Sequence, residues 1–175
     1  MTIHIIIDGY NLIRQSTALS PLDQQDIQLG REALIERLVH YRQIKHHKIT
    51  IVFDGANAPV FSNRRDRIKG IHIEFSGINE SADTLIKKMA GRERQKALVV
   101  SSDLDIVHYS TTQGASTISS PEFEEKIDMA LFMDLKGFDL EADGESGWVP
   151  TTKKKGPTKR LPRRQRQSRI KIQKL

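Results

Sequence analysis

The chain has no cysteine among its 175 residues. This absence excludes a disulfide scaffold, a zinc site built from thiolates and a cysteine nucleophile. It is typical of a reducing compartment, and we therefore expect a cytoplasmic protein. Aromatic residues make up only 6% of the chain. Base stacking on aromatic rings can thus contribute little, and we expect weak sequence preference in any binding of nucleic acid.

Long hydrophobic runs are also missing. The apolar run at the N-terminus, residues 5–7, ends at Asp8 and is much too short for a signal peptide or a membrane span. We therefore expect no targeting segment and no membrane partner. No Gly-x-Ser-x-Gly segment occurs, which argues against a serine nucleophile of the elbow type. The six histidines show no metal-ligand spacing.

Acidic residues are absent from the last part of the chain. Residues 151–175 contain 11 of the 28 Lys and Arg residues and no Asp or Glu. The first 150 residues therefore carry 17 basic groups against all 22 acidic ones. An acidic body with a basic tail suggests that one part holds a polyanion and the other binds a cation such as a metal ion.

Apolar periodicity predicts strands that alternate with helices. The expected strands span residues 3–7, 49–53, 71–75, 97–100 and 115–118, and the expected helices span residues 29–44, 81–89, 105–113 and 120–133. Such βαβ units favour a mainly parallel central sheet between two helical layers. The sequence thus predicts an α/β three-layer sandwich over residues 1–138. Apolar periodicity is lost over residues 139–175, which predicts a linker and a basic, disordered tail there.

Carboxylates follow the ends of several predicted strands. Asp8 and Asp54 end the first two strands, Asp103 and Asp105 follow the strand at 97–100, and Asp83 lies in the first turn of the helix after the third. Ligands of open α/β sheets bind at this edge. Two carboxylates about 4 Å apart repel by roughly 4 kcal/mol at a dielectric near 20, so either some of them are protonated or a cation is bound. Oxygen ligands alone favour Mg²⁺, and the chemistry expected is metal-assisted hydrolysis of a phosphodiester.

Each of these residues also has a purely structural interpretation. An Asp after a strand is often an N-cap, and we expect Asp105 to cap the short helix while Asp103 serves as ligand. Asp54 before Gly55 is consistent with plain turn chemistry. Asn11 could orient Asp8, touch substrate or satisfy its own backbone. Ser101 could donate to a phosphate or a carboxylate, or cap the chain.

Basic side chains near this edge are candidates for binding phosphates, and Tyr10 is a candidate for stacking a base or for packing under the loop. Three arginines are expected in a loop between the second and third strands, and two lysines one turn beyond Asp83. The alternatives are a solvated charged surface for these and a solubilising extension for the tail. The basic candidates are Arg64, Arg65, Arg67, Lys87, Lys88 and, in the tail, Lys153, Lys154, Lys155, Arg163 and Arg164.

Four segments, IIIDGYNLI, ITIVFDG, SADTLI and ALVVSSDLDI, resemble the motifs of NYN-domain nucleases, which are PIN-like, and more narrowly those of the YacP-like bacterial group. The resemblance covers about residues 3–127, and the part from residue 138 on departs from the group's pattern. It implies that Asp8, Asp83 and Asp103 coordinate Mg²⁺ or Mn²⁺ and are catalytic, with Asn11 and Asp105 in support; Asp54 matches a group feature.

The same resemblance implies an endoribonuclease with no nucleotide cofactor. Because the group includes an enzyme that cuts messenger RNA on the translating ribosome, it also implies mRNA as substrate and the ribosome as a partner. Two alternatives stay open. One is a non-catalytic RNA-binding module on the same fold. The other is a phosphatase or Toprim-like enzyme, although Asp8 is followed by Gly9-Tyr10 rather than by an Asp-x-Asp motif, and no strand ends in Glu.

Overall fold

A six-stranded sheet forms the centre of the protein in the computed structural model, which describes residues 3–58, 64–137 and 162–175. The strand order is β3-β4-β2-β1-β5-β6. All neighbouring pairs are parallel except β3 with β4. The strands are β1 (His4–Asp8), β2 (Lys48–Phe53), β3 (Arg65–Ile68), β4 (Ile71–Phe75), β5 (Ala97–Val100) and β6 (Ser116–Ile118).

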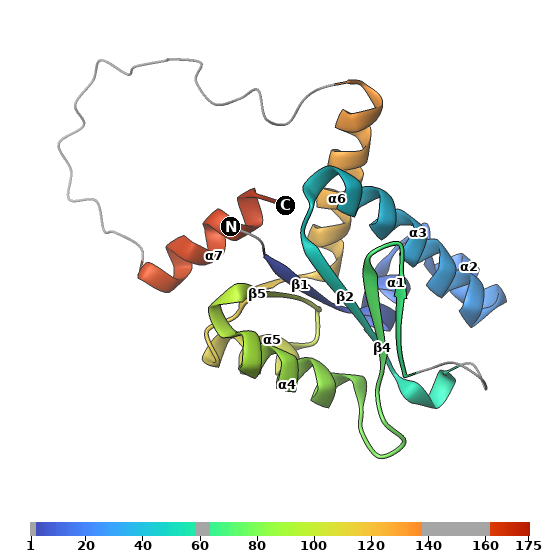
Figure 1. The fold of residues 1–175 in the computed structure, drawn as a ribbon, viewed down its shortest axis with the longest axis horizontal. Helices are drawn as coiled ribbons and strands as arrows, with labels where there is room; N and C mark the ends of the chain where they lie inside the picture. Colours follow the sequence, from blue (N-terminus) through green and yellow to red (C-terminus); the bar gives the residue numbers. More distant parts are fainter. Residues whose placement is uncertain (1–2, 59–63, 138–161) are drawn as a thin grey trace.

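Helices cover both faces of this sheet (Figure 1). One buried cluster joins the sheet to α1, α3 and α6, and a second joins the opposite face to α4 and α5. The predicted three-layer α/β sandwich is therefore confirmed. The helices are α1 (Gly9–Gln15), α2 (Ser20–Gln25), α3 (Ile27–Lys45), α4 (Ala82–Glu93), α5 (Leu104–Thr112), α6 (Ser120–Leu135) and α7 (Arg163–Gln173), with short 3₁₀ helices η1 (Gly55–Asn57) and η2 (Arg94–Lys96).

The register brings the ends of the parallel strands to common edges. Ile7 pairs with Val100 and Asp8 with Val52, so β1, β2 and β5 end together. We call this the carboxyl edge; Asp8, Asp54 and Ser101 lie there. The opposite side, where the parallel strands begin, we call the amino edge. This alignment is what lets side chains distant in sequence meet.

No helix was predicted between the strand at 3–7 and the helix at 29–44, but the segment after β1 forms two helices, α1 and α2. Asp8 caps α1, because its Oδ1 accepts a hydrogen bond from the backbone N–H of Asn11 at 3.3 Å. Pro21 lies in the first turn of α2, where its missing N–H costs nothing. Both start signals are visible in the sequence, but the helices have 7 and 6 residues and are too short to show a clear apolar period.

The arginine-rich segment was expected to be a loop, and this prediction is wrong. Residues 65–68 form β3, which pairs with β4 as an antiparallel hairpin. The hairpin turns at Lys69 and Gly70, whose φ angles of 45° and 89° are those of a two-residue turn that matches strand twist. Backbone pairing sets this strand, and its exposed charges suit a sheet edge. Apolar periodicity therefore gives no sign of it.

The C-terminal residues are helical where a disordered tail was expected. Residues 163–173 form α7, and Leu175 is only 4% exposed because it joins the main core. The prediction of disorder is thus wrong for residues 162–175. The low apolar content of α7 gives no periodic signal in the sequence. The ammonium of Lys171, near its end, holds the helix by hydrogen bonds to backbone oxygens. The rest of the expected linker, including Lys153, Lys154 and Lys155, lies outside the described residues.

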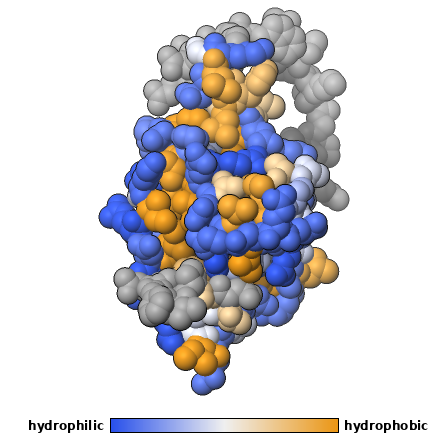
Figure 2. Space-filling model, turned by 90° about the vertical axis from the view of Figure 1, so that its right-hand side faces the viewer, coloured by the Kyte–Doolittle hydropathy of each residue, from blue (hydrophilic) through white to orange (hydrophobic). Residues whose placement is uncertain are grey.

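The surface on the side of α2 and α3 is mostly hydrophilic, with hydrophobic groups in separate patches (Figure 2). One such group lies at the lowest part of the molecule in this view, which Figure 1 shows to be the loop between β4 and α4. Ile78, in that loop, is 91% exposed. No helix within the described residues combines the length and the apolar character that crossing a membrane would require.

Candidate active site at the carboxyl edge

Asp8 is the carboxylate around which the site is built. Its side chain is only 8% exposed. Its Oδ1 accepts from the backbone of Asn11, and its Oδ2 accepts from the Ser101 hydroxyl at 3.2 Å. Burial raises the pKa of Asp8 from 3.8 to about 6, although both hydrogen bonds oppose this; the charges of Asp83 and Asp103 add to the rise. Asp8 is therefore a buried acid with negative neighbours.

An open pocket of about 650 Å³ lies in front of Asp8. Three carboxylates from different parts of the chain share its wall: Asp8 from the end of β1, Asp54 after β2, and Asp83 from the first turn of α4. Asp103 is not part of the wall, but it is near enough to act on the pKa of Asp8. The lining residues are Asp8, Tyr10, Asn11, Arg14, Gln15, Asp54, Ala56, Ala82 and Asp83.

Asp103, not Asp105, caps α5, which corrects the expectation. The Oδ1 of Asp103 accepts from the backbone N–H groups of Asp105 and Ile106, at 2.8 and 3.3 Å. Both bonds use one oxygen, so Oδ2 of Asp103 keeps its lone pairs for another partner. Asp105 lies in the first turn of α5 and forms an ion pair with Lys87.

Asn11 joins three segments through one atom. Its Oδ1 accepts from the backbone N–H of Ser102 at 3.0 Å, from the Ser120 hydroxyl at 2.7 Å and from Nε2 of Gln15 at 3.3 Å. The oxygen is therefore fully used within the protein. The amide Nδ2, on a side chain that lines the pocket, is left as a donor. Asn11 thus fixes α1 against the starts of α5 and α6.

Ser101 and Asp54 hold the rim of the site in shape. Ser101 is fully buried; its hydroxyl donates to Asp8 and accepts from the backbone N–H of Asp103 at 3.1 Å. Asp54 caps η1 by accepting from the N–H of Ala56 at 2.9 Å. Gly55 follows because a Cβ there would lie 2.0 Å from the backbone oxygen of Ser76.

Tyr10 and the two lysines of α4 differ as candidates for RNA contact. Tyr10 is only 6% exposed and packs on Phe53 with ring centroids 5.1 Å apart, which fits packing under the loop better than base stacking. Lys87 and Lys88 are engaged in ion pairs, with Asp105 and Glu80 respectively.

Of the three arginines, Arg64 and Arg65 lie at the carboxyl edge, because Arg65 pairs with Glu74 near the end of β4. Arg65 also forms an ion pair with Glu74 at 3.3 Å. Arg67 lies two residues farther from that edge, opposite His72. Only the first two are thus placed beside the strand ends.

Two polar residues of the pocket wall, Arg14 and Gln15, were missed from the sequence. Both lie on α1, three and four positions after Asn11, and so share its side of the helix. The signal was Asp8 itself, because an N-cap at that position starts a helix whose spacing brings these residues to one face.

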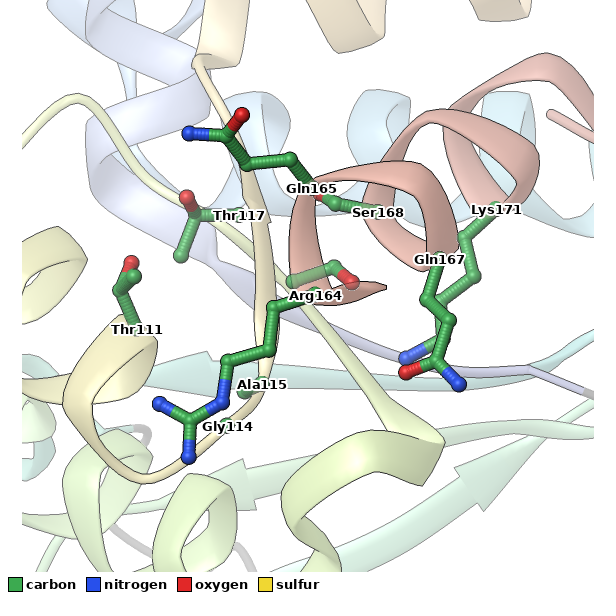
Figure 3. A pocket seen from close by; sticks show the side chains of 10 residues that line it. Thr111, Gly114, Ala115, Thr117, Arg164, Gln165, Gln167, Ser168 and Lys171 are labelled. Carbon is green, nitrogen blue, oxygen red and sulfur yellow. The ribbon is translucent and has the colours of Figure 1, made fainter. Parts of the chain in front are cut away.

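The basic residues of α7 lie away from this pocket. Lys171 donates to the backbone oxygens of Gln95 and Ala97, which places α7 at the amino edge. Arg163 and Arg164 are exposed at the start of this helix. In Figure 3 the Arg164 side chain extends from α7 toward the turn at Gly114, across a cavity of about 130 Å³. Neither arginine adjoins the acidic pocket.

Among the residues that the structure describes, no group of three His, Cys, Asp or Glu side chains is close enough to hold a metal ion. The expected set of Asp8, Asp83 and Asp103 is therefore not a closed ligand cage. What the structure brings together is an open acidic pocket with Asp8 and Asp83 in its wall and Asp103 beside Asp8.

Comparison with known proteins agrees with the fold. The chain is similar to uncharacterized protein YacP of Bacillus subtilis (strain 168), with 26% identity over 86 residues, which are 49% of this chain and 50% of that protein. It thus spans about half the length of the curated relative that it matches.

Two crystal structures from Bacillus subtilis, of Rae1 (YacP) and of a tryptophan-to-leucine mutant of it, are also similar. They superpose with TM-scores of 0.66 and 0.64 and are both 23% identical to this chain; they cover 78% and 77% of it, and it covers 79% and 80% of them. Identity this low shows a shared fold alone. The sequence model of the YacP-like NYN domain, however, matches residues 5–140, which is well over half of the chain. The chain therefore belongs to the YacP-like NYN domain family.

Proposed function

We propose that this protein is a metal-dependent endoribonuclease that hydrolyses phosphodiester bonds of RNA. The observation that carries the proposal is the open pocket whose wall contains carboxylates from three separate segments. Burial, with a smaller contribution from the charges of Asp83 and Asp103, raises the pKa of Asp8 to about 6, so the charged carboxylate is unfavourable there unless a cation binds. Membership of the NYN family, generally a nuclease fold, supports RNA hydrolysis as the chemistry.

The donor set fits Mg²⁺ or Mn²⁺ bound in an open way. Mg²⁺ is usually held by one or two carboxylates, by water and by substrate phosphate, so it needs no closed cage. Asp8 and Asp83 would hold the ion from the pocket wall, and Asp103 would assist through its free Oδ2. When bound, the ion supplies an activated water and neutralises charge on the phosphate.

The remaining side chains position this set. Ser101 and the backbone of Asn11 fix the two oxygens of Asp8, which keeps the carboxylate directed and favours its charged form. The Nδ2 of Asn11 is placed to donate to a phosphate oxygen in the pocket. Asp54 contributes charge at the rim, and Asp105 contributes mainly by holding Lys87.

Messenger RNA as the substrate and the ribosome as a partner belong to the same proposal. Their support is the likeness of the four sequence motifs to the YacP-like group, whose members include an mRNA endonuclease acting on the ribosome. Arg64 and Arg65, beside the strand ends, would then follow the phosphates of a strand that enters the pocket.

The test is cleavage of labelled mRNA with Mg²⁺, Mn²⁺ or EDTA, with and without ribosomes, and mapping of the 5′ ends produced. Asp83→Asn and Asp103→Asn are each expected to lower the rate at least a hundredfold, because even outer-shell partners of metal sites cost about 10- to 100-fold. The exposed Asp134→Asn, far along α6, is the matched control and should cut normally. Undiminished cutting by the first two variants, or in EDTA, would contradict the proposal.

A second candidate is a non-catalytic RNA-binding module. It is favoured by α7 and the residue after it, where five exposed cations occur with no acidic residue: Arg163, Arg164, Arg166, Arg169 and Lys174. This candidate predicts that the Asn variants and EDTA change nothing and that removal of the tail abolishes binding. The same assay, read as RNA retained rather than RNA cut, decides between the two.

A further inference from the structure

Among the residues that the structure describes, Arg14 is the only Lys or Arg that lines the acidic pocket. It lies on α1, the helix that Asp8 caps and that carries Asn11. One short helix therefore presents a carboxylate at its start, an amide in its first turn and a guanidinium in its last. Because this helix is rigid and packed on the core, the spacing of the three groups along the pocket wall is fixed.

The position of Arg14 is set by a buried platform. Its guanidinium carbon lies 5.4 Å from the centre of the Tyr10 ring, at the distance of a cation–π contact. Tyr10 in turn packs on Phe53, and its hydroxyl accepts from Nη1 of the buried Arg31 at 3.1 Å. The face of the Tyr10 ring thus supports Arg14, which gives this tyrosine a role other than stacking a base.

Arg14 forms no ion pair with any residue that the structure describes, although three carboxylates line the same pocket. The contrast with its neighbours is informative. Lys87 and Lys88, on the α4 side of the same edge, are both paired with carboxylates. A cation that stands in an acidic pocket and remains unpaired keeps its five N–H donors for an anion that enters from outside.

We infer that Arg14 binds a phosphate of the RNA strand next to the phosphate that is cut. This inference rests on the proposed function, because it takes the pocket to hold RNA. A guanidinium matches a phosphate with two parallel hydrogen bonds, which the point charge of a lysine cannot reproduce. The pocket then requires a strand with at least two successive phosphates, so a mononucleotide or other small phosphate ester is a poor ligand.

The test measures binding, so that it does not depend on cleavage. Single-stranded RNA oligonucleotides with one neutral methylphosphonate at each successive position are titrated with the full chain in EDTA by fluorescence anisotropy. Neutralising the phosphate that faces Arg14 is expected to weaken binding about fivefold, since one charge-assisted contact is lost. Neutralising the phosphate that faces the carboxylates should strengthen binding, because without metal that phosphate is repelled.

In Arg14→Ala, neutralising the phosphate that faces Arg14 should no longer weaken binding. Neutralising the phosphate that faces the carboxylates should still strengthen it. The slope of log affinity against log salt should fall by about 0.7, the value for one phosphate contact of a single strand. Arg14→Lys should restore the salt slope but only part of the affinity. Arg92→Ala is the matched control, because Arg92 is likewise an exposed arginine in the last turn of a helix, away from the pocket.

An unchanged position pattern in Arg14→Ala would overturn the inference, and so would a failure of every oligonucleotide to bind. Cleavage is assayed in parallel with Mg²⁺. If the expected pattern is found while no RNA is cut, the nuclease proposal fails and the phosphate site at Arg14 stands. If RNA is cut normally and the pattern is independent of Arg14, the nuclease proposal stands and the phosphate site at Arg14 fails.

Discussion

The two edges of the sheet each bury a charged side chain, and they treat it differently. At the amino edge, Lys171 is 7% exposed, but its ammonium donates to the backbone oxygens of Gln95 and Ala97. Tyr41 and His47 complete this edge through the backbone oxygens of Leu175 and Lys174, at 3.0 and 3.3 Å. The ammonium of Lys171 therefore has backbone acceptors, and α7, which carries it, lies over this edge.

At the carboxyl edge, Asp8 is equally buried but faces an open pocket and other carboxylates. Its two hydrogen bonds do not offset burial, and its pKa stays raised at about 6. Burial of a charge therefore does not by itself identify a site. Burial also lowers the pKa of Lys171, so the charged form is disfavoured at both edges. The two edges differ in what surrounds the charge: backbone acceptors at the amino edge, and other carboxylates before an open pocket at the carboxyl edge.

The largest effect on stability is expected from removal of α7. Deletion of residues 162–175 is expected to lower the free energy of unfolding by about 4 kcal/mol, from the lost burial of Leu175 and Ile172 and the lost hydrogen bonds. Urea denaturation measures this. The kcat for RNA at saturation, corrected for folded protein, should not change. A lost kcat with normal folding would show that the two edges are coupled.

A smaller change in stability is expected from Asp8→Asn, which should lower the rate of RNA cleavage and raise the free energy of unfolding. With the pKa raised from 3.8 to about 6, the folded state binds the proton more tightly than the unfolded state, so wild-type stability falls as pH rises from about 4 to about 6. At pH 7 and without metal, the variant should therefore be more stable by up to about 3 kcal/mol.

This gain should vanish below about pH 4, where Asp8 is protonated in both states. Thermal unfolding over a pH series, with EDTA present, checks it. Asp134→Asn is the control and should stay within about 0.5 kcal/mol of wild type at every pH. A variant that is less stable than wild type at pH 7 would mean that the hydrogen bonds to Asp8 outweigh its burial.

Substitution of Asn11 tests whether activity at the carboxyl edge depends on the amide oxygen that joins its segments. Asn11→Ala removes the acceptor of three hydrogen bonds and should reduce kcat about 10- to 100-fold, as loss of an orienting partner does. Gln15→Ala removes only one of the three and should cost much less. Equal losses from both would assign the effect to something other than the convergence at Asn11.

The smallest effect is expected at the amino edge from Tyr41→Phe, which removes one buried hydrogen bond to Leu175. The free energy of unfolding should fall by about 1 kcal/mol, because the acceptor is left unpaired. RNA cleavage should be unaffected. An activity change in this variant, measured at a temperature where it is fully folded, would contradict the separation of the two edges.

The sequence predicts the carboxyl edge better than the amino edge for a physical reason. Parallel strands are buried on both faces, so β1, β2 and β5 appear as apolar runs, and each run ends at a residue that can be named. The convergence of Asp8, Asp54 and Asp83 on one pocket follows from that pattern. The confirmed membership of the YacP-like NYN family rests on the same segments.

The features that the sequence analysis missed depend on contacts rather than on pattern. The β3 strand exists through backbone pairing, and α7 is seated by Lys171 and Leu175, so neither has an apolar period to detect. Asp105 was predicted to cap α5, but the cap is Asp103, because a helix start is uncertain by a residue or two from sequence alone. The assignment of ligands to individual aspartates stays a prediction.

The hydrogen bond from Tyr41 to Leu175 joins residues 134 positions apart. Closing so large a loop carries an entropic cost that has to be met before the contact contributes anything, which makes it a late event in folding. During synthesis, the strands and α3 are available long before Leu175 is added, so a nascent chain can build its sheet while that edge is still bare. Residues 162–175 therefore stabilise a sheet that can form without them. Chains that lack these residues should reach a native-like state that unfolds more easily.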